Sequence, residues 1–373
     1  MKREPPSGDN PLVRLGQLGQ SVWYDYITRD LLLSGELARL IREDGLRGMT
    51  SNPTIFEKAI AGSSLYDDDI RRLSEQGRSA ADIFEAIAVA DVQAACDAFT
   101  PLYRESGKRD GFVSLEVSPR LAQDADGTLQ EARRLWKAVA RPNAMIKIPG
   151  TRAGLSAISR AIAAGINVNV TLLFSVDRYA EVIEAFLQGL ESRLEQHLSI
   201  NGIASVASFF VSRVDGKIDP LLDRMEQSGL RGKVAIANAA LAYRLFGQSQ
   251  CTARWDQLAA AGANPQRPLW ASTSTKDPRY PDVYYVEALI ARDTVNTVPP
   301  ETLAAYRDHG QPAVRIDEAT AAAPGQLARL REAGIDLPAI TRELEEDGVD
   351  KFAASYAAVL SGIEAKVGTL AAR

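Results

Sequence analysis

The sequence predicts an α/β protein whose strands close into a parallel (β/α)8 barrel, the TIM-barrel fold. Short β-type runs alternate with amphipathic helical stretches along most of the 373 residues, and eight such runs can be counted. This alternation is typical of a parallel sheet covered by helices, and eight strands suit a closed barrel. The alternative is an open, doubly wound sheet, but the Gly-x-Gly-x-x-Gly turn that often begins such a sheet is absent.

Each predicted strand is a short apolar run, rich in β-branched or aromatic residues, that ends at turn-forming or polar residues. In chain order, the strands are expected at 21–27, 47–51, 111–117, 143–149, 166–173, 204–211, 268–273 and 293–297. The predicted helices carry apolar residues every three to four positions, most clearly within 176–197. They are expected at 34–43, 80–105, 128–139, 153–164, 176–197, 219–225, 232–246, 281–291 and 301–308. Asp82 and Asp91 suggest a break within 80–105.

The two ends of the chain are expected to differ. Residues 1–12 contain Pro5-Pro6-Ser7-Gly8 and are expected to be disordered. After residue 311, two further helices at 325–333 and 350–366 are expected to pack on the barrel, so residues 13–373 should form a single domain.

Composition narrows the class of protein. Hydrophobic residues make up 46% and charged residues 24%, as in ordinary soluble proteins. The net charge of −5 and the lack of a basic arm argue against nucleic-acid binding. No apolar stretch is long enough for a bilayer and no secretory signal is visible, so a cytoplasmic protein without a membrane partner is expected. Two distant cysteines, Cys96 and Cys251, and two histidines, His197 and His309, argue against a disulfide framework, a zinc site or a histidine-based triad.

Lys147 is the most informative single residue. It interrupts the apolar run of residues 143–150, which ends in Pro-Gly and therefore predicts a buried strand leading into a loop. Burial disfavours a charged ammonium, and a neutral lysine amine can attack a carbonyl to form a Schiff base. Two structural alternatives remain open: Lys147 pairs with a buried carboxylate, or its amine reaches the surface.

Chemistry in a (β/α)8 barrel lies at the carboxyl ends of the strands, and polar residues collect there in this sequence. Asparagine is depleted in strands and costly in a core, so the alternating Asn167, Asn169 and Thr171 suggest function. Each candidate also has a structural interpretation, such as a helix cap for Asn52 or a pairing of Glu116 with Lys147. The candidates are Asp25, Asn52, Glu116, Lys147, Asn169, Thr171, Ser208, Arg213, Ser274 and Lys276.

These residues lie in blocks that resemble transaldolases, in particular the longer bacterial type. The matching blocks include TSNPTIF at 50–56, SLEV at 114–117, MIKIP at 145–149, NVNVTLLFS at 167–175, ASFFVSRVD at 207–215 and VNTVPPET at 295–302. They run in family order from near the start of the chain to about residue 310, so the resemblance is specific. The last part of the chain contributes little to it.

The resemblance implies a class I, Schiff-base-forming transferase that needs no metal or cofactor. Such an enzyme moves a dihydroxyacetone unit from sedoheptulose 7-phosphate or fructose 6-phosphate to glyceraldehyde 3-phosphate or erythrose 4-phosphate, in the non-oxidative pentose phosphate pathway. Its partners would be sugar phosphates, and a monomer or homodimer is expected.

The resemblance also implies roles for the candidates. Lys147 would form the Schiff base, Asp25 would transfer protons, and Glu116 and Thr171 would hold a water. Asn52, Asn169 and Ser208 would bind the dihydroxyacetone hydroxyls, and Arg213, Ser274 and Lys276 would bind phosphate. Lys276 departs from the pattern, because the short transaldolases carry arginine there.

Two other functions remain as alternatives. Fructose-6-phosphate aldolase has a related barrel, but its pattern has glutamine in place of Glu116 and tyrosine in place of Phe210, and its chain is much shorter. A non-catalytic sugar-phosphate-binding barrel is the second alternative. Against it, Lys147, Asp25 and Glu116 are all retained.

Overall fold

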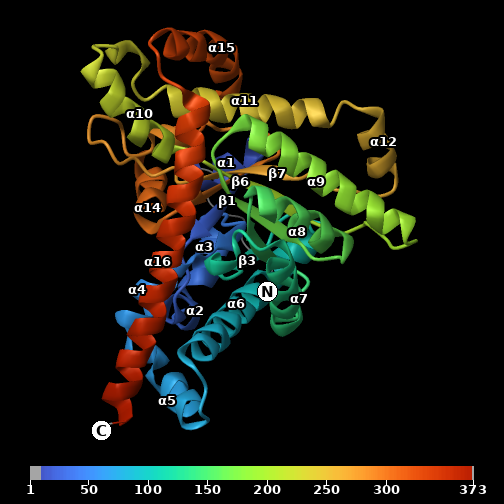
Figure 1. Ribbon diagram of the computed structural model, residues 1–373, viewed down its shortest axis with the longest axis vertical. Coiled ribbons are helices and arrows are strands. Elements are labelled where there is room, and N and C mark those ends of the chain that lie inside the picture. Colours follow the sequence, from blue (N-terminus) through green and yellow to red (C-terminus); the bar gives the residue numbers. More distant parts are fainter. Residues whose placement is uncertain (1–9, 372–373) are drawn as a thin grey trace.

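A closed barrel of eight parallel strands forms the centre of the computed structural model, which describes residues 10–371 (Figure 1). The strands pair in chain order, and the last pairs with the first, which confirms the predicted fold and excludes the open sheet. Every strand lies within two residues of its predicted bounds. They are β1 (Gln20–Asp25), β2 (Gly48–Thr50), β3 (Phe112–Glu116), β4 (Ala144–Pro149), β5 (Val168–Leu173), β6 (Ser205–Phe210), β7 (Arg267–Ala271) and β8 (Thr294–Val298).

The register of neighbouring strands sets which polar side chains meet inside the barrel. Glu116 on β3 is the partner of Lys147 on β4, and Lys147 is the partner of Asn169 on β5. Residues in register across parallel strands point to the same face of the sheet. Side chains on the other face meet the surrounding helices, as Phe209 of β6 does when its ring packs against Tyr179, with ring centroids 6.3 Å apart.

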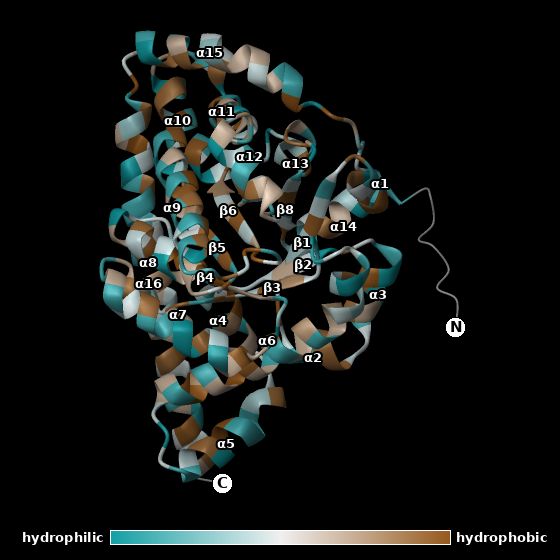
Figure 2. Ribbon diagram, turned by 90° about the vertical axis from the view of Figure 1, so that its right-hand side faces the viewer, coloured by the Kyte–Doolittle hydropathy of each residue, from teal (hydrophilic) through white to brown (hydrophobic). Residues whose placement is uncertain are grey.

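The surrounding helices carry hydrophobic and hydrophilic residues side by side, as amphipathic helices do (Figure 2). All helices predicted from periodicity are present. Several begin earlier or extend further than expected, whereas the helix expected at 281–291 is limited to Tyr284–Ala288. Their bounds are α3 (Glu36–Glu43), α6 (Ala80–Glu105), α7 (Ala125–Val139), α8 (Arg152–Ala163), α9 (Val176–Glu195), α10 (Ser212–Arg224), α11 (Val234–Ser249), α13 (Tyr284–Ala288), α14 (Pro300–His309), α15 (Ile316–Glu332) and α16 (Leu337–Ala371).

Other helices were not predicted, because they are short or follow directly on a strand end. They are α1 (Pro11–Gln17), α2 (Arg29–Leu33), α4 (Pro53–Ala61), α5 (Asp67–Glu75) and α12 (Ala253–Ala260). Short 3-10 turns lie at Ser64–Tyr66, Pro119–Leu121 and Ser228–Leu230.

The predicted break inside residues 80–105 is wrong, since α6 is continuous. Asp82 forms a capping box with Ser79 at the helix start, a role that favours rather than interrupts a helix. Asp91 is buried in the helix, but its carboxylate accepts hydrogen bonds from Arg29 and from the Tyr66 hydroxyl. The polar group is therefore satisfied without leaving the helix.

The carboxyl-terminal helices pack on the rest of the molecule. Helix α15 lies against α11, and the long α16 runs past α4 and α10 towards α5 and α6 (Figure 1). These contacts support the expectation that residues 13–373 form one domain, which stays a prediction. Most of the expected disordered segment lies outside the described residues. Of its last residues, Asn10 caps α1 and Leu12 is buried.

No helix in the described part of the chain combines the length and the apolar surface that a bilayer crossing requires.

Candidate active site

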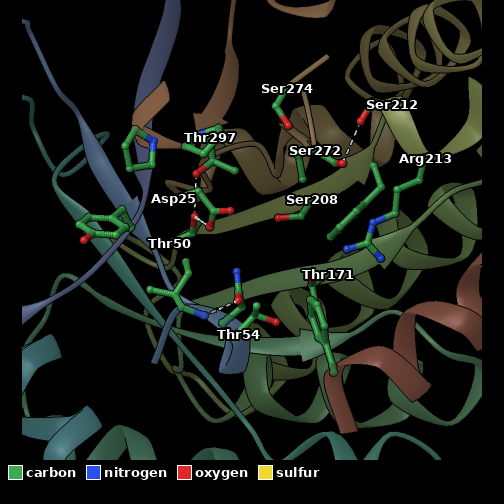
Figure 3. Close-up of a pocket in the computed structure, with 18 of the residues that line it drawn as sticks. Asp25, Thr50, Thr54, Thr171, Ser208, Ser212, Arg213, Ser272, Ser274 and Thr297 are labelled. Atoms are coloured by element: carbon green, nitrogen blue, oxygen red, sulfur yellow. Dashed lines mark hydrogen bonds between the residues drawn. The ribbon is translucent and has the colours of Figure 1, made fainter. Parts of the chain in front are cut away.

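A cavity of about 650 Å³ opens at the carboxyl ends of the strands, where chemistry was expected. Figure 3 shows its polar wall, with Asp25 on one side, Arg213 on the other, and Ser208 and Thr171 between them. Most of the candidate residues line this cavity: Asp25, Asn52, Lys147, Thr171, Ser208, Arg213, Ser274 and Lys276. The remaining two, Glu116 and Asn169, lie against residues of the lining.

Lys147 is buried, with 4% of its surface exposed. Its Nζ donates a hydrogen bond to the carbonyl oxygen of Ser51 at 3.2 Å and lies 3.4 Å from Oε2 of Glu116. Lys147 therefore forms the buried ion pair with Glu116 that the structural alternative predicts, and it also lines the cavity. An amine held by one carbonyl and one carboxylate at a cavity wall is positioned to meet a carbonyl carbon.

Glu116 and Thr171 present buried oxygens beside this amine. Both carboxylate oxygens of Glu116 and the hydroxyl of Thr171 lack a hydrogen-bond partner among the described residues. Burial raises the pKa of Glu116 to about 7, and the positive charge of Lys147 opposes the shift. Because the carboxyl group titrates near neutral pH, it can both donate and accept a proton there.

Asp25 ends β1 and faces the cavity (Figure 3). Its Oδ1 accepts a hydrogen bond from the Thr50 hydroxyl at 2.7 Å, and Thr50 also contacts the hydroxyl of Thr297 at 2.6 Å. Burial raises the pKa of Asp25, while the charge of Lys147 and the Thr50 hydrogen bond lower it. The hydroxyl chain fixes the orientation of a carboxylate that can exchange protons with a bound molecule.

The predicted hydroxyl-binding residues differ in their positions. Ser208 lines the cavity and donates to Oδ1 of Asn169 at 2.7 Å, and Asn169 in turn donates to Ser114 at 2.9 Å. Asn169 is fully buried beneath Ser208, so it orients the serine, and its direct contact with a substrate stays a prediction. Asn52 lines the cavity and also caps α4, accepting from the amide of Ile55 at 3.1 Å.

The stripe of Asn167, Asn169 and Thr171 divides by depth. Asn167 lies just before β5, at the opposite end of the strand from the cavity residue Thr171. Its side-chain amide donates to the carbonyl oxygens of Pro142 and Ala144. Its amide therefore joins strand ends rather than lining the site.

Two cationic side chains, Arg213 and Lys276, line the outer part of the cavity. Arg213, on the first turn of α10, stacks near Phe210 with 4.9 Å between its guanidinium carbon and the ring centroid. Among residues 10–371, no acidic side chain lies within ion-pair distance of this half-buried guanidinium. Lys276 is exposed at the rim, and Ser274 is buried next to it. Unpaired positive charge beside hydroxyl groups suits a phosphate.

Comparison with known proteins agrees with this geometry. A family model described as Transaldolase/Fructose-6-phosphate aldolase matches residues 22–363. The chain is 48% identical over 365 residues to a transaldolase of Parafrankia sp. (strain EAN1pec), covering 97% of this chain and 99% of that protein. It is 49% identical over 367 residues to a transaldolase of Frankia alni, with 96% and 98% covered.

The chain belongs to the transaldolase family. Transaldolases are transferases, so the prediction of an enzyme of this class is confirmed. Transaldolase 2 of a Nostoc species is also 46% identical over 375 residues. The names of these relatives favour transaldolase over fructose-6-phosphate aldolase, the other activity in the family description.

Sequence reasoning missed several residues of the transaldolase cavity. Thr50 and Thr297 lie inside the resembling blocks, where their position at strand ends could have identified them. Lys58 on α4 lines the cavity, but it follows the strand by a full helical turn and gave no strand-end pattern. Phe352 comes from α16, in the part of the chain that contributed little to the resemblance.

The histidines lie away from this site. Both are exposed, and His309 pairs with Asp282 and Asp308 at the end of α14. Among residues 10–371, no three His, Cys, Asp or Glu side chains are grouped as a metal ion would require.

Proposed function

We propose that this chain transfers a dihydroxyacetone unit between sugar phosphates through a Schiff base on Lys147. The donor would be sedoheptulose 7-phosphate or fructose 6-phosphate, and the acceptor glyceraldehyde 3-phosphate or erythrose 4-phosphate. The observation that carries the proposal is the buried Lys147 amine, 3.4 Å from Glu116 and open to a cavity that also holds Asp25.

In the first half-reaction, Nζ of Lys147 attacks the C2 ketone of the donor, and loss of water gives an iminium. Glu116, with its pKa raised to about 7, is suited to give a proton to the leaving hydroxyl through a water held with Thr171. Asp25 then accepts the proton of the C4 hydroxyl as the C3–C4 bond breaks. The electron pair moves to the iminium nitrogen, an aldose phosphate leaves, and an enamine stays bound.

In the second half-reaction, the enamine carbon attacks the aldehyde of the acceptor, and Asp25 returns its proton to the new alkoxide. Water then adds to the iminium carbon and frees Lys147. Ser208, oriented by Asn169, and Asn52 would hydrogen-bond the hydroxyls of the three-carbon unit. These bonds would hold the enamine in place between the two half-reactions.

Phosphate would bind at the outer end of the cavity. Arg213 supplies a guanidinium without an acidic partner among the described residues, and Lys276 and Ser274 add an ammonium and a hydroxyl. A lysine acts on phosphate as a point charge, so Arg213 would provide the bidentate contact.

The cellular setting is part of the same proposal. We place the enzyme in the cytoplasm, in the non-oxidative pentose phosphate pathway, as a monomer or homodimer. Sugar phosphates of this pathway are the substrates that its cavity would meet there.

The test is an assay with fructose 6-phosphate and erythrose 4-phosphate. Wild type should form glyceraldehyde 3-phosphate, and Lys147→Ala should lose at least about a thousandfold in kcat, because it lacks the nucleophile. Lys233→Ala is the matched control, since Lys233 is exposed and contacts the carbonyl oxygen of Gly229. Comparable activity in Lys147→Ala and Lys233→Ala would rule out the proposal.

A further inference from the structure

Helix α16 brings an aromatic ring to the catalytic amine from outside the barrel. Phe352 lines the cavity, and its ring centroid lies 5.5 Å from Nζ of Lys147. Only 5% of Phe352 is exposed. The two residues are far apart in sequence, so the contact depends on how α16 passes over the carboxyl ends of the strands (Figure 1).

The helix is fixed in this position by close packing one turn before Phe352. A Cβ atom added to Gly348 would lie 2.9 Å from Cδ2 of Leu172, so a larger residue there would require the end of the Leu172 side chain to shift. Leu172 adopts a positive φ of 61°, next to Thr171 in the cavity wall. The close approach therefore joins α16 to the strand end that carries a candidate catalytic residue.

Polar contacts hold the same stretch of α16 on three sides. Ser355 shares a hydrogen bond of 2.8 Å with Thr54 of α4. Glu345 pairs with Arg178 of α9 at 3.3 Å, and Asp347 pairs with Lys217 of α10 at 3.1 Å. Phe352 lies between these contacts, so its ring is held over Lys147 by a fixed element.

We propose that Phe352 is a specificity-determining residue that keeps water from the enamine, so that the three-carbon unit is transferred rather than released. The inference rests on the proposed function. The side reaction it suppresses adds a proton to C3 of the enamine and then water to C2. The C2–N bond breaks, the amine of Lys147 is restored, and free dihydroxyacetone leaves; the net change consumes one water.

The surroundings of the ring explain why an apolar side chain matters there. Beside the Lys147 amine, the buried oxygens of Glu116 and the Thr171 hydroxyl make no hydrogen bond among the described residues, although Oε2 of Glu116 lies 3.4 Å from that amine. Such oxygens can hold the one water that the proposed mechanism uses, whereas the aromatic ring of Phe352, near the same amine, offers no hydrogen-bonding group to further water. A ring within about 6 Å of the nitrogen also stabilises its positive iminium form.

The experiment compares two rates in each variant: release of free dihydroxyacetone from fructose 6-phosphate alone, and transfer to erythrose 4-phosphate. Phe352→Ala should raise the ratio of release to transfer about tenfold, and Phe352→Leu, which keeps more apolar volume, about threefold. Val359→Ala is the matched control, because Val359 is buried on the same helix but does not line the cavity. Its ratio should equal that of wild type.

The result is read together with borohydride trapping of the Lys147 adduct. If Phe352→Leu and Phe352→Ala still form the adduct but have the same ratio of release to transfer as Val359→Ala, the role of Phe352 is overturned and the proposed function is not. Should Phe352→Ala not fold, the Phe352→Leu ratio decides. If wild type forms no adduct, the proposed function and this inference both fail.

Discussion

At the scale of single residues, the site depends on how a buried amine is matched to its neighbours. Lys147 faces one carboxyl group, Glu116, whose pKa lies near 7, and a second, Asp25, whose pKa burial also raises. Two acids in different hydrogen-bonding environments can divide the proton transfers between them. Asp25 is held by hydroxyls, whereas Glu116 has no hydroxyl partner among the described residues.

A third buried acid, Asp215, supports the helix that carries Arg213. Its Oδ1 accepts from the amide of Ala235 at 2.8 Å and its Oδ2 from the hydroxyl of Tyr285 at 3.0 Å, which joins α10 to α11 and α13. Burial and repulsion from Asp219 raise the pKa of Asp215 from 3.8 to about 7. Between these values the folded state binds more protons than the unfolded state, so the contribution of Asp215 to stability falls as pH rises.

Asp215→Asn removes this pH dependence and keeps the acceptor for Ala235. From pH 5 to pH 8, the stability of Asp215→Asn relative to wild type should rise by about 2–3 kcal/mol. Urea unfolding at the two pH values measures this change. The control is Asp68→Asn, which removes a carboxylate that is 97% exposed. The raised pKa of Asp215 would be contradicted if the stability of Asp215→Asn relative to wild type changed between the two pH values by no more than that of Asp68→Asn.

At the scale of elements, the strands and most catalytic candidates could be predicted because their patterns are local. Each strand is a short apolar run, and the polar residue at its end marks the same face of the barrel, as with Asp25 and Lys147. Helices that begin directly after a strand were harder to predict. Asn52 followed by Pro53 is compatible with a turn or a helix cap, and in the structure Asn52 caps α4.

Contacts between distant elements could not be predicted in this way. Nothing in the sequence around Phe352 distinguishes it from any other apolar residue on a helix. Its contact with Lys147 accompanies the close approach of α16 to Leu172 at Gly348, one turn earlier, which is visible only in the folded chain. Asp91 shows a related error: an acid inside a helical pattern suggested a break, but Arg29 and Tyr66, from other elements, bind its carboxylate within a continuous helix.

Two glycines on α16 test this packing. Glycine to alanine normally stabilises a helix by about 0.5–1 kcal/mol, and Gly362→Ala should do so because nothing lies within 4 Å of its added Cβ. In Gly348→Ala this gain should be at least partly offset, because the Cδ2 atom of Leu172 lies 2.9 Å from the added Cβ and must shift. Thermal or urea unfolding of the two variants gives the sign of each change. Equal stabilisation by both would show that α16 does not approach β5 so closely.

At the scale of the whole molecule, the barrel assembles one site from all eight strands and from helices added after them. Asp25 and Thr297 come from β1 and β8, the strands that close the barrel. Lys147 comes from β4, and Phe352 from the last helix. Strand pairing in chain order brings these residues to one end, and α16 covers part of that end. The site is therefore complete only when the entire chain is folded.

The central claim is that Lys147 captures the donor ketone. The direct test is reduction with borohydride in the presence of fructose 6-phosphate, followed by mass spectrometric mapping of the modified lysine. The proposed mechanism predicts a reduced three-carbon adduct on the peptide containing Lys147, and none in Lys147→Ala. Lys58 and Lys276 also line the cavity and serve as internal controls. An adduct on either of them instead, or one that persists in Lys147→Ala, would contradict the claim.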